Sequence, residues 1–284
     1  MILVTGATGT VGSEIVKQLV EARQKVRVLT RDPAKALKFG NAVEVVKGDL
    51  SKPETLGPAF VGVDKAFVLS SPGPELATLE GNAYDVAKST GTTHIVKLSA
   101  LGVETDVMAG SPGGEWHGQS EKRLRALGTA WTILRPGPFF SNVINFWGIT
   151  QRGGLFLPTG NGKDTHIDPR DIAAVAVTVL TTPGHEGKIY ELTGPELLSY
   201  AEVVQKIAAV TGKPFKFVDV PEAAWRQEML SAGFPSFMVD TLLFHFAAVK
   251  AGRWYVTSTV DELLGRPART FEQWAKDHVA VLRS

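Results

Sequence analysis

Short runs of apolar residues alternate with segments of helical spacing through the first half of the chain. The apolar runs are typical of strands buried on both faces, and they cover residues 2–4, 26–29, 43–46, 66–69 and 95–98. The segments between them place apolar residues three and four positions apart, which predicts helices at 11–22, 53–60 and 76–90. This repeated β-α order predicts an α/β fold built on a parallel sheet with helices on both faces.

The second half continues the pattern less regularly. Apolar runs at 131–134 and 189–192 predict two more strands. Asp168 and Asp171 surround a proline at a helix start, so we interpret them as helix-capping residues and not as paired catalytic carboxylates. Two capping boxes, SYAE from Ser199 and TFEQ from Thr270, predict two further helix starts.

Aromatic residues are unevenly distributed between the two halves. Only five precede residue 131, namely Phe39, Phe60, Phe67, Tyr84 and Trp116. A second core rich in rings explains this distribution, and so does a lobe that lines an apolar pocket. We expect a dinucleotide-binding domain at 1–140 and 163–193, and a smaller C-terminal α/β lobe at 141–162 and 194–284.

A glycine-rich segment, TGATGTVG at residues 5–12, follows the first strand and begins the first helix. Gly6 permits a tight turn, Gly9 lets a pyrophosphate approach the backbone, and Gly12 lets the helix pack closely. The helix N-terminus offers free N–H groups to phosphates. In this strand–turn–helix context the segment predicts a Rossmann doubly wound fold that binds a dinucleotide. An unliganded glycine turn is the alternative. Thr8, Thr10 and Val11 complete the expected cofactor loop.

In dinucleotide-binding folds, the residues at the end of the second strand determine whether NAD or NADP is bound. A carboxylate there accepts from a ribose 2′-hydroxyl, whereas basic residues accommodate a 2′-phosphate. The sequence has Thr30 at that position, followed by Arg31, with Lys35 one turn further. Asp32 is explained as a cap before Pro33. We therefore expect NADP(H) to be preferred over NAD(H), with solvent exposure of Arg31 as the alternative.

Polar residues also follow the third and fourth strands. Asp49, followed by Leu50, is expected to hydrogen-bond an adenine amino group, and a turn-forming or capping role is compatible with that use. Ser70, Ser71 and Pro72 are expected beside the phosphates and the nicotinamide ribose.

Composition narrows the class of protein further. A net charge of +1 gives no electrostatic case for nucleic acid or an anionic membrane as a partner. The chain has no cysteine, which excludes disulfides and thiolate sites. Neither a signal-peptide core nor a membrane-spanning run is visible, so a cytoplasmic protein is expected. No metal site is expected, because His94, His166, His185, His245 and His278 show no metal-ligand spacing.

Several segments together resemble one family. They are TGATGTVG at 5–12, VLTRDPAK at 28–35, GDL at 48–50, LRPGPFFSN at 134–142, HIDPRDIA at 166–173 and GRPARTFEQW at 265–274. The chain resembles the NmrA-like branch of the atypical short-chain dehydrogenase/reductases, and within it the bacterial NAD(P)H-dependent quinone reductases and azoreductases; triphenylmethane dye reductase is a related member. The resemblance implies a Rossmann domain, a small C-terminal lobe and hydride transfer without flavin. The branch that the chain resembles also includes non-catalytic NADP(H)-binding redox sensors.

Short-chain dehydrogenases use a serine, a tyrosine and a lysine, with the tyrosine as the acid/base. Alignment on the resemblance places the serine at Ser99, whereas Gly113 replaces the tyrosine and His117 replaces the lysine. A reversible alcohol dehydrogenase of the usual kind is therefore not expected. The resemblance implies that Ser99 and His117 lie at the catalytic and cofactor site, and Pro136 at the cofactor.

Helical spacing gives a separate argument about His117. Leu124 and Leu127 define a buried stripe, and stepping back by three and four residues reaches Ser120 and His117. His117 is therefore expected to point inward near a helix start, with Glu121 able to orient its imidazole. Proton donation, a ribose-holding role and simple exposure in a solvated first turn all stay open.

The chemistry expected is hydride transfer to a quinone, an azo dye or a cationic triarylmethane dye, which are small aromatic acceptors that take hydride readily. Phe139, Phe140 and Asn142 are the nearest candidates to contact such an acceptor. A redox-sensing NADP(H)-binding regulator is the main alternative, and an isomerase or ene-type reductase is a third. Monomer and homodimer both stay open.

Overall fold

A seven-stranded sheet forms the centre of the first of two units in the computed structural model, which describes residues 1–283. Unit 1 comprises Met1–Ala100, Glu115–Arg135 and Pro169–Glu191. Its elements, some of which extend past these limits, are β1 (Ile2–Val4), α1 (Thr10–Glu21), β2 (Val26–Thr30), the 3₁₀ helix η1 (Pro33–Ala42), β3 (Glu44–Lys47), η2 (Pro53–Thr55), α2 (Gly57–Phe60), β4 (Lys65–Val68), α3 (Leu76–Ser89), β5 (His94–Leu98), α4 (Pro112–Arg125), β6 (Ala130–Pro136), α7 (Pro169–Thr181) and β9 (Lys188–Leu192).

The strand order is β3-β2-β1-β4-β5-β6-β9, and the pairs from β3 through β6 are parallel. The order reverses beside β1, since the chain first builds outward through β2 and β3 and then returns to β4 on the other side. In open parallel sheets, ligands bind at the carboxyl ends of the strands at such a reversal. The predicted Rossmann-like doubly wound sheet is confirmed.

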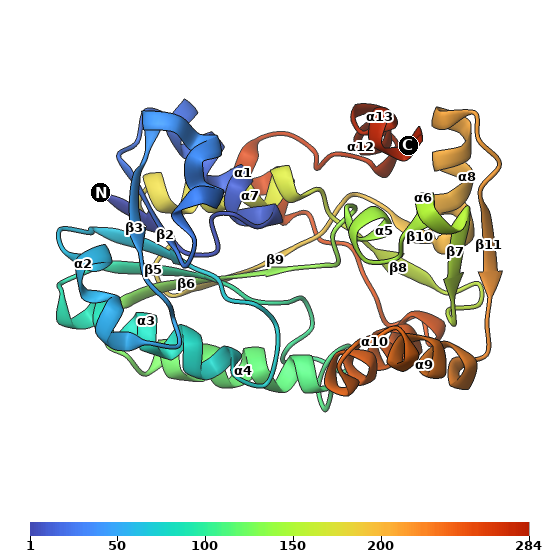
Figure 1. Cartoon of the computed structure of the whole chain (residues 1–284), viewed down its shortest axis with the longest axis horizontal. Helices are drawn as coiled ribbons and strands as arrows, with labels where there is room; N and C mark the ends of the chain where they lie inside the picture. The colour runs from blue at the N-terminus through green and yellow to red at the C-terminus, as the bar shows by residue number, and fades with distance from the viewer. Residues whose placement is uncertain (284) are drawn as a thin grey trace. The chain divides into compact units, whose positions relative to one another are not determined.

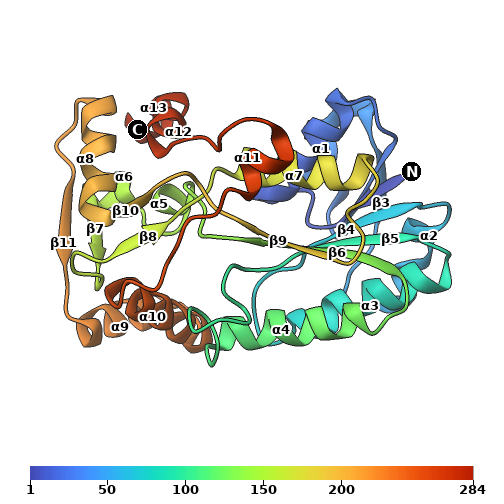
Figure 2. The same ribbon diagram turned by 180° about the vertical axis from the view of Figure 1, so that it is seen from behind.

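Helices cover both faces of this sheet, as Figures 1 and 2 show, with α1 and α7 on one side and α3 and α4 on the other. Helix α1 buries Val11, Ile15 and Leu19, which are spaced by four residues along one face. The 53–60 segment differs from the expected single helix. It forms η2 and the one-turn α2, because Gly57 and Pro58 interrupt the helical spacing.

Unit 2 comprises Leu101–Gly114, Pro136–Asp168 and Leu192–Ser284 and is almost as long as unit 1, although a smaller lobe was expected. Its boundaries also take in residues 101–114, 136–140, 163–168 and 192–193, which were expected in the dinucleotide-binding domain. Its elements are α5 (Asn142–Asn145), α6 (Ile149–Arg152), β7 (Gly154–Leu157), β8 (Lys163–Thr165), β10 (Leu197–Ser199), α8 (Tyr200–Thr211), β11 (Lys216–Asp219), α9 (Glu222–Ser231), α10 (Ser236–Lys250), α11 (Thr259–Leu264), α12 (Phe271–Asp277) and α13 (Val279–Arg283).

Two short strand pairs in unit 2 were not expected from the sequence. Strand β10 pairs antiparallel with β8, and β11 pairs parallel with β7. Each strand has only three or four residues, which is too short for a period of two to stand out. Both predicted capping boxes are present, at the starts of α8 and α12.

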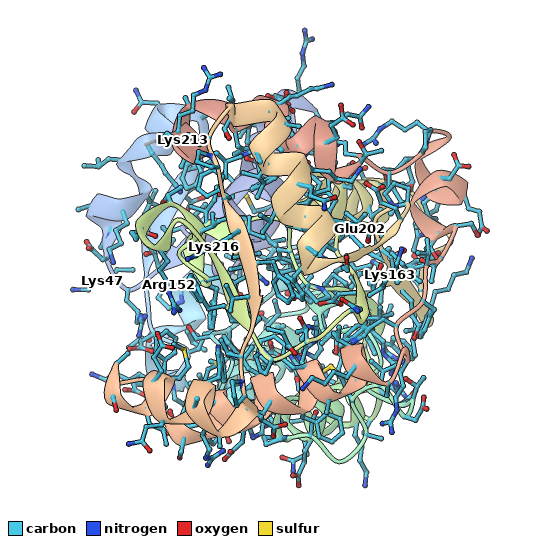
Figure 3. The ribbon with its side chains drawn as sticks, turned by 90° about the vertical axis from the view of Figure 1, so that its right-hand side faces the viewer. Lys47, Arg152, Lys163, Glu202, Lys213 and Lys216 are labelled. Carbon is cyan, nitrogen blue, oxygen red and sulfur yellow. The ribbon has the colours of Figure 1, made fainter. Side chains whose placement is uncertain are left out.

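Unit 2 has its own apolar core, in which large rings dominate. Trp225, Trp274, Phe246 and Phe271 are almost completely buried there. On its surface, Figure 3 shows Lys163 beside Glu202, with 3.2 Å between Nζ and Oε1. The aromatic excess of the second half is therefore accounted for in large part by packing.

Candidate active site

A cavity of about 460 Å³ opens in unit 1 at the point where the strand order reverses. The loops that follow β1, β2, β3 and β4 line it. Its lining residues are Thr5, Gly6, Thr8, Gly9, Leu29, Thr30, Arg31, Asp32, Lys35, Gly48, Asp49, Leu50, Ser51, Leu69, Ser70, Ser71, Glu75 and Leu79.

The glycine loop between β1 and α1 forms one wall of this cavity. Gly6 has φ +59°, a left-handed conformation that glycine adopts without strain. A Cβ at Gly12 would lie 2.2 Å from the Gly6 carbonyl oxygen, so this position admits no side chain without a shift. The Thr5 hydroxyl donates to the Leu69 carbonyl and accepts from the Leu69 N–H, both at 2.8 Å, which fixes the loop to the end of β4. The loop is thus a backbone cradle at the N-terminus of a 12-residue helix.

Two basic side chains line the cavity after β2, and a third contacts the glycine loop. Arg31 and Lys35 are exposed and line it. Lys38, which the sequence analysis did not single out, donates from Nζ to the Thr8 carbonyl at 3.3 Å. Asp32 caps the first turn of η1, since its Oδ1 accepts from the backbone N–H two residues on at 3.0 Å. The capping role predicted for Asp32 is confirmed.

Asp49 also lines the cavity, and it forms a turn with Ser51. Its Oδ1 accepts from the Ser51 backbone N–H at 3.0 Å and from the Ser51 hydroxyl at 2.9 Å. These hydrogen bonds, chiefly the backbone one, and the charges of Arg31 and Lys52 hold the pKa of Asp49 below its ordinary value. The turn-forming role is present, and the carboxylate stays ionised at the cavity wall.

Not every residue proposed for the cofactor lines this cavity. Val11 and Gly12 are buried within α1, where they position the cradle and do not form its surface. The remaining residues outside the lining are Thr10, Pro72, Ser99, His117 and Pro136.

Ser99 follows β5 and is buried against an ion-pair group. Its hydroxyl donates to Glu121 Oε1 at 2.5 Å. Glu121 Oε2 lies 2.6 Å from Arg135 and 2.7 Å from Arg125. Glu121 therefore neutralises arginines and anchors Ser99. The expectation that it orients His117 is wrong, because both of its oxygens are used elsewhere.

His117 lies on α4 and is half-buried, in line with the inward stripe that also contains the buried Ser120 and Leu124. Its Nδ1 is 3.3 Å from the Nζ of Lys97. Loss of hydration, and then the positive charge of Lys97, hold the pKa of His117 well below its ordinary value of 6.5.

Lys97 belongs to a buried group that the sequence analysis missed, here called the Glu80 network: Ser70, Glu80, Tyr84, Lys97, His117 and Ser120. Lys97 Nζ is 2.7 Å from Glu80 Oε2, and both side chains are fully buried. The Ser70 hydroxyl, on the cavity wall, donates to Glu80 Oε1 at 3.3 Å. A signal for the network existed in the sequence: a lysine inside the apolar run HIVKL, and a glutamate on the buried face of the 76–90 helix.

Tyr84 does not replace the missing tyrosine of short-chain dehydrogenases. It is fully buried, with its hydroxyl 3.1 Å from Glu80 and 2.9 Å from Ser120. Burial, and then the charge of Glu80, raise its pKa well above 10, so it keeps its proton. A Cβ at Gly113 would lie 2.9 Å from Thr241 Cγ2, so a larger side chain there would require a shift.

The three acceptor candidates of unit 2 differ in exposure. Phe139 and Asn142 are half-buried. Phe140 is only 1% exposed and packs edge-on against Phe271, with 5.1 Å between ring centroids. The expectation that Phe140 contacts an acceptor is therefore not supported: it is a core residue.

Within residues 1–283, no group of three or more metal-ligating side chains is arranged to hold an ion. In the same part of the chain, no helix combines the length and the apolar character needed to cross a bilayer.

The reversal-point cavity, the glycine cradle and the basic side chains of Arg31 and Lys35 define a Rossmann-type nicotinamide dinucleotide-binding protein. The family of NAD(P)H-binding proteins matches residues 6–183, and the chain belongs to that family. The predicted resemblance to bacterial NAD(P)H-dependent quinone reductases and azoreductases is confirmed, and the fold is shared with NmrA.

Two curated relatives extend along almost the whole chain. The NAD(P)H azoreductase of Xenophilus azovorans is 39% identical over 289 residues, which cover 99% of both chains. The (4-alkanoyl-5-oxo-2,5-dihydrofuran-3-yl)methyl phosphate reductase of Streptomyces griseus is 35% identical, over 98% of each chain. The similarity to these two relatives shows that the chain is an NAD(P)H-dependent oxidoreductase.

Solved structures agree with this assignment. The NADPH complex of the Escherichia coli quinone oxidoreductase QOR2 has a TM-score of 0.86, with 26% identity over 98% of this chain and 99% of that one. The Citrobacter triphenylmethane reductase in complex with NADP(H) has a TM-score of 0.82, with 26% identity and the same coverage. The transcriptional regulator NmrA, at 17% identity and a TM-score of 0.78, shares the fold.

Proposed function

We propose that this protein is an NADPH-dependent reductase that transfers hydride to a quinone or a similar electron-poor aromatic acceptor without using flavin. The observation that carries the proposal is the 460 Å³ cavity, in which a glycine cradle and a pair of basic side chains meet at the sheet reversal. The similarity to an azoreductase and to a quinone oxidoreductase supports the choice of acceptor.

The cavity suits a dinucleotide phosphate. Gly6 and Gly9 expose backbone at the start of α1, where N–H groups and positive potential favour a pyrophosphate. Arg31 and Lys35 offer a planar fork and a point charge to a 2′-phosphate, and Asp32 is occupied as a helix cap. Asp49 retains a charged oxygen at the wall for the adenine. NADPH supplies the hydride when it is bound.

We infer the chemical class of the acceptor from the lack of a catalytic tyrosine at its usual position. No tyrosine stands at position 113, and Tyr84 keeps its proton inside the core. Ordinary dehydrogenases reduce a carbonyl group, and they need a general acid that protonates the carbonyl oxygen as hydride is transferred. A quinone or a cationic dye spreads or cancels the new charge, so a site without such a donor is adequate. Phe139 and Asn142 are the proposed acceptor contacts.

Steady-state oxidation of NADPH tests the proposal, with a panel of 1,4-benzoquinones, azo dyes, triarylmethane dyes and an unsaturated furanone. The furanone represents the second candidate, an ene-type reductase, which the 35% identical relative favours. We expect turnover of quinones without added flavin. Tight NADPH binding with no turnover of any acceptor would contradict the enzyme proposal and favour the redox-sensing regulator.

Arg31→Ala tests the cofactor preference. Loss of a charged hydrogen-bonding partner to a phosphate costs about 1.5–3 kcal/mol, so the Kd for NADPH should rise roughly 10- to 150-fold. The Kd for NADH should stay within about twofold. Lys17→Ala, on the exposed face of α1 away from the cavity, is the control. An equal loss for both cofactors would refute the 2′-phosphate role.

A further inference from the structure

The imidazole of His117 faces an ammonium group and not a carboxylate. Lys97 Nζ lies 3.3 Å from Nδ1 of the ring. An ammonium has three N–H donors and no acceptor, so Nδ1 must be the acceptor in this contact. The one proton of a neutral imidazole then lies on Nε2.

The position of Lys97 is fixed on its other sides. Its Nζ also donates to the Leu98 carbonyl at 3.0 Å and forms the 2.7 Å ion pair with Glu80. Its side chain is fully buried, as is that of Glu80. Three partners thus take up the three N–H donors, and the buried charge is paired.

Glu80 is surrounded by groups that can donate hydrogen bonds to its two oxygens. Hydroxyl groups of Ser70 and Tyr84 lie at 3.3 and 3.1 Å from its two oxygens, and Ser120 donates to Oε2 as well. All of these neighbours can donate, and an ionised carboxyl group only accepts. The 2.7 Å contact between Lys97 and Glu80 pairs two groups of opposite charge, which offsets the cost of burying either one alone.

Among residues 1–283, Lys97 is the charged group that acts on the His117 ring, and no acid opposes it. Glu121, on the same helix as His117, accepts a hydrogen bond from Ser99 and forms ion pairs with Arg125 and with Arg135 of β6. The nearest charge to the ring is therefore that of Lys97 on β5, and Glu80 on α3 lies beyond it. An imidazolium here would be placed beside an ammonium in a poorly hydrated environment, which is unfavourable.

We propose that Lys97 is a positioning residue that fixes His117 as the neutral Nε2–H tautomer, and that His117 acts on the acceptor by donating a hydrogen bond and not a proton. The second half of the proposal rests on the proposed reductase function. The acceptor takes two electrons and a hydrogen nucleus as hydride from NADPH and one proton from solvent, giving a hydroquinone and NADP⁺. His117 keeps its proton throughout.

Nitrogen-15 NMR of the resting protein tests the tautomer directly, with His117→Gln to assign the signal. We expect Nδ1 to appear as an unprotonated nitrogen and Nε2 as a protonated one between pH 6 and 8, with no titration near 6.5. A protonated Nδ1, or a ring that titrates near 6.5, would overturn the proposal. This readout needs no substrate, so a failure of the proposed function would not affect it.

Because Lys97→Met alone leaves Glu80 without a counter-ion and can prevent folding, the second test uses Lys97→Met/Glu80→Gln, which is neutral and keeps the hydroxyl contacts. In this variant the pKa of His117 should move upward toward 6.5, and both tautomers should become populated. With a quinone, kcat for the wild type should show no ionisation of His117 from pH 5.5 to 8, whereas in the double variant the ionisation of His117 should move upward, although loss of hydration still holds its pKa below 6.5. Identical NMR titrations in the two proteins would refute the role of Lys97.

Discussion

A buried carboxylate of unit 1, Glu80, and a buried carboxylate of unit 2, Asp164, both lie among polar groups, but their partners differ. In unit 1, Glu80 is paired with the ammonium of Lys97. In unit 2, Asp164 Oδ2 accepts from Tyr200 at 2.9 Å and from His245 at 2.7 Å, and His166 lies 3.7 Å away; these four residues are called the Asp164 cluster.

The difference lies in whether the countercharge is permanent. Burial acts to raise the pKa of Asp164, but His245, His166 and the hydrogen bonds from His245 and Tyr200 outweigh it and hold the pKa below 3.8. The Asp164 cluster thus depends on titratable rings. In the Glu80 network the partner of the carboxylate is a lysine, and through Ser70 the network reaches a cavity wall. A buried carboxylate alone does not mark a functional site, whereas its connection to a ligand cavity does.

The largest effect is expected from Lys97→Met. It leaves the Glu80 charge buried and unpaired, so the free energy of unfolding should fall by about 3–5 kcal/mol. Urea denaturation measures this change, with Lys47→Met, an exposed lysine on β3, as the control.

Adding Glu80→Gln to Lys97→Met should recover most of that loss, because an apolar and a neutral polar group replace the ion pair. A double variant no more stable than the single one would show that packing of the lysine stem, and not charge pairing, dominates at this position.

A smaller loss, about 1–3 kcal/mol, is expected for Asp164→Asn in unit 2. The amide oxygen can still accept one hydrogen bond, but the stronger hydrogen bonds that an ionised carboxylate accepts are lost. At pH 7 the carboxylate contribution is fully present, since the pKa of Asp164 lies below 3.8 and the contribution is lost only as the pH falls through it. The Kd for NADPH should not change. A weakened Kd would contradict the view that the Asp164 cluster serves the core of its own unit.

Acid sensitivity separates the two regions further. His117 and His166 are both neutral in the folded protein, so the unfolded chain binds more protons below pH 6.5 and stability falls there by up to about 1.4 kcal/mol per pH unit for each ring. Lys97 lowers the pKa of His117 further, whereas Asp164 opposes the lowering at His166. His117→Gln should therefore flatten the acid limb of the stability curve more than His166→Gln, measured by urea denaturation from pH 4 to 7. The reverse order would contradict the assignment of charges.

Regular spacing of apolar residues made the sheet of unit 1 predictable, whereas the partners of the buried polar residues could not be predicted from spacing. The apolar runs and the glycine loop located the strands and the cavity, because parallel strands buried on both faces leave a plain signal. Lys97 was overlooked inside such a run, because a lysine in a buried strand contradicts the pattern and its partner Glu80 comes from another element. Glu121 was assigned to His117 from spacing of four residues, but spacing does not reveal that Arg135 approaches from β6. Local periodicity predicts which residues point inward, and only the tertiary structure identifies their partners.

The smallest effect is expected from Ser70→Ala. This change removes the hydrogen bond from Ser70, on the cavity wall, to Glu80. That bond is long, at 3.3 Å, and Glu80 keeps its other donors, so the free energy of unfolding should fall by only about 0.5–1.5 kcal/mol. Because Ser70 lines the cavity, the Kd for NADPH should nevertheless rise by a few fold, whereas Ser89→Ala on the exposed end of α3 should change neither quantity. Isothermal titration of both variants with NADPH makes the comparison. If Ser70→Ala lowers stability as much as Asp164→Asn and leaves the Kd unchanged, the two buried carboxylates play the same structural part, and the distinction drawn from the cavity fails.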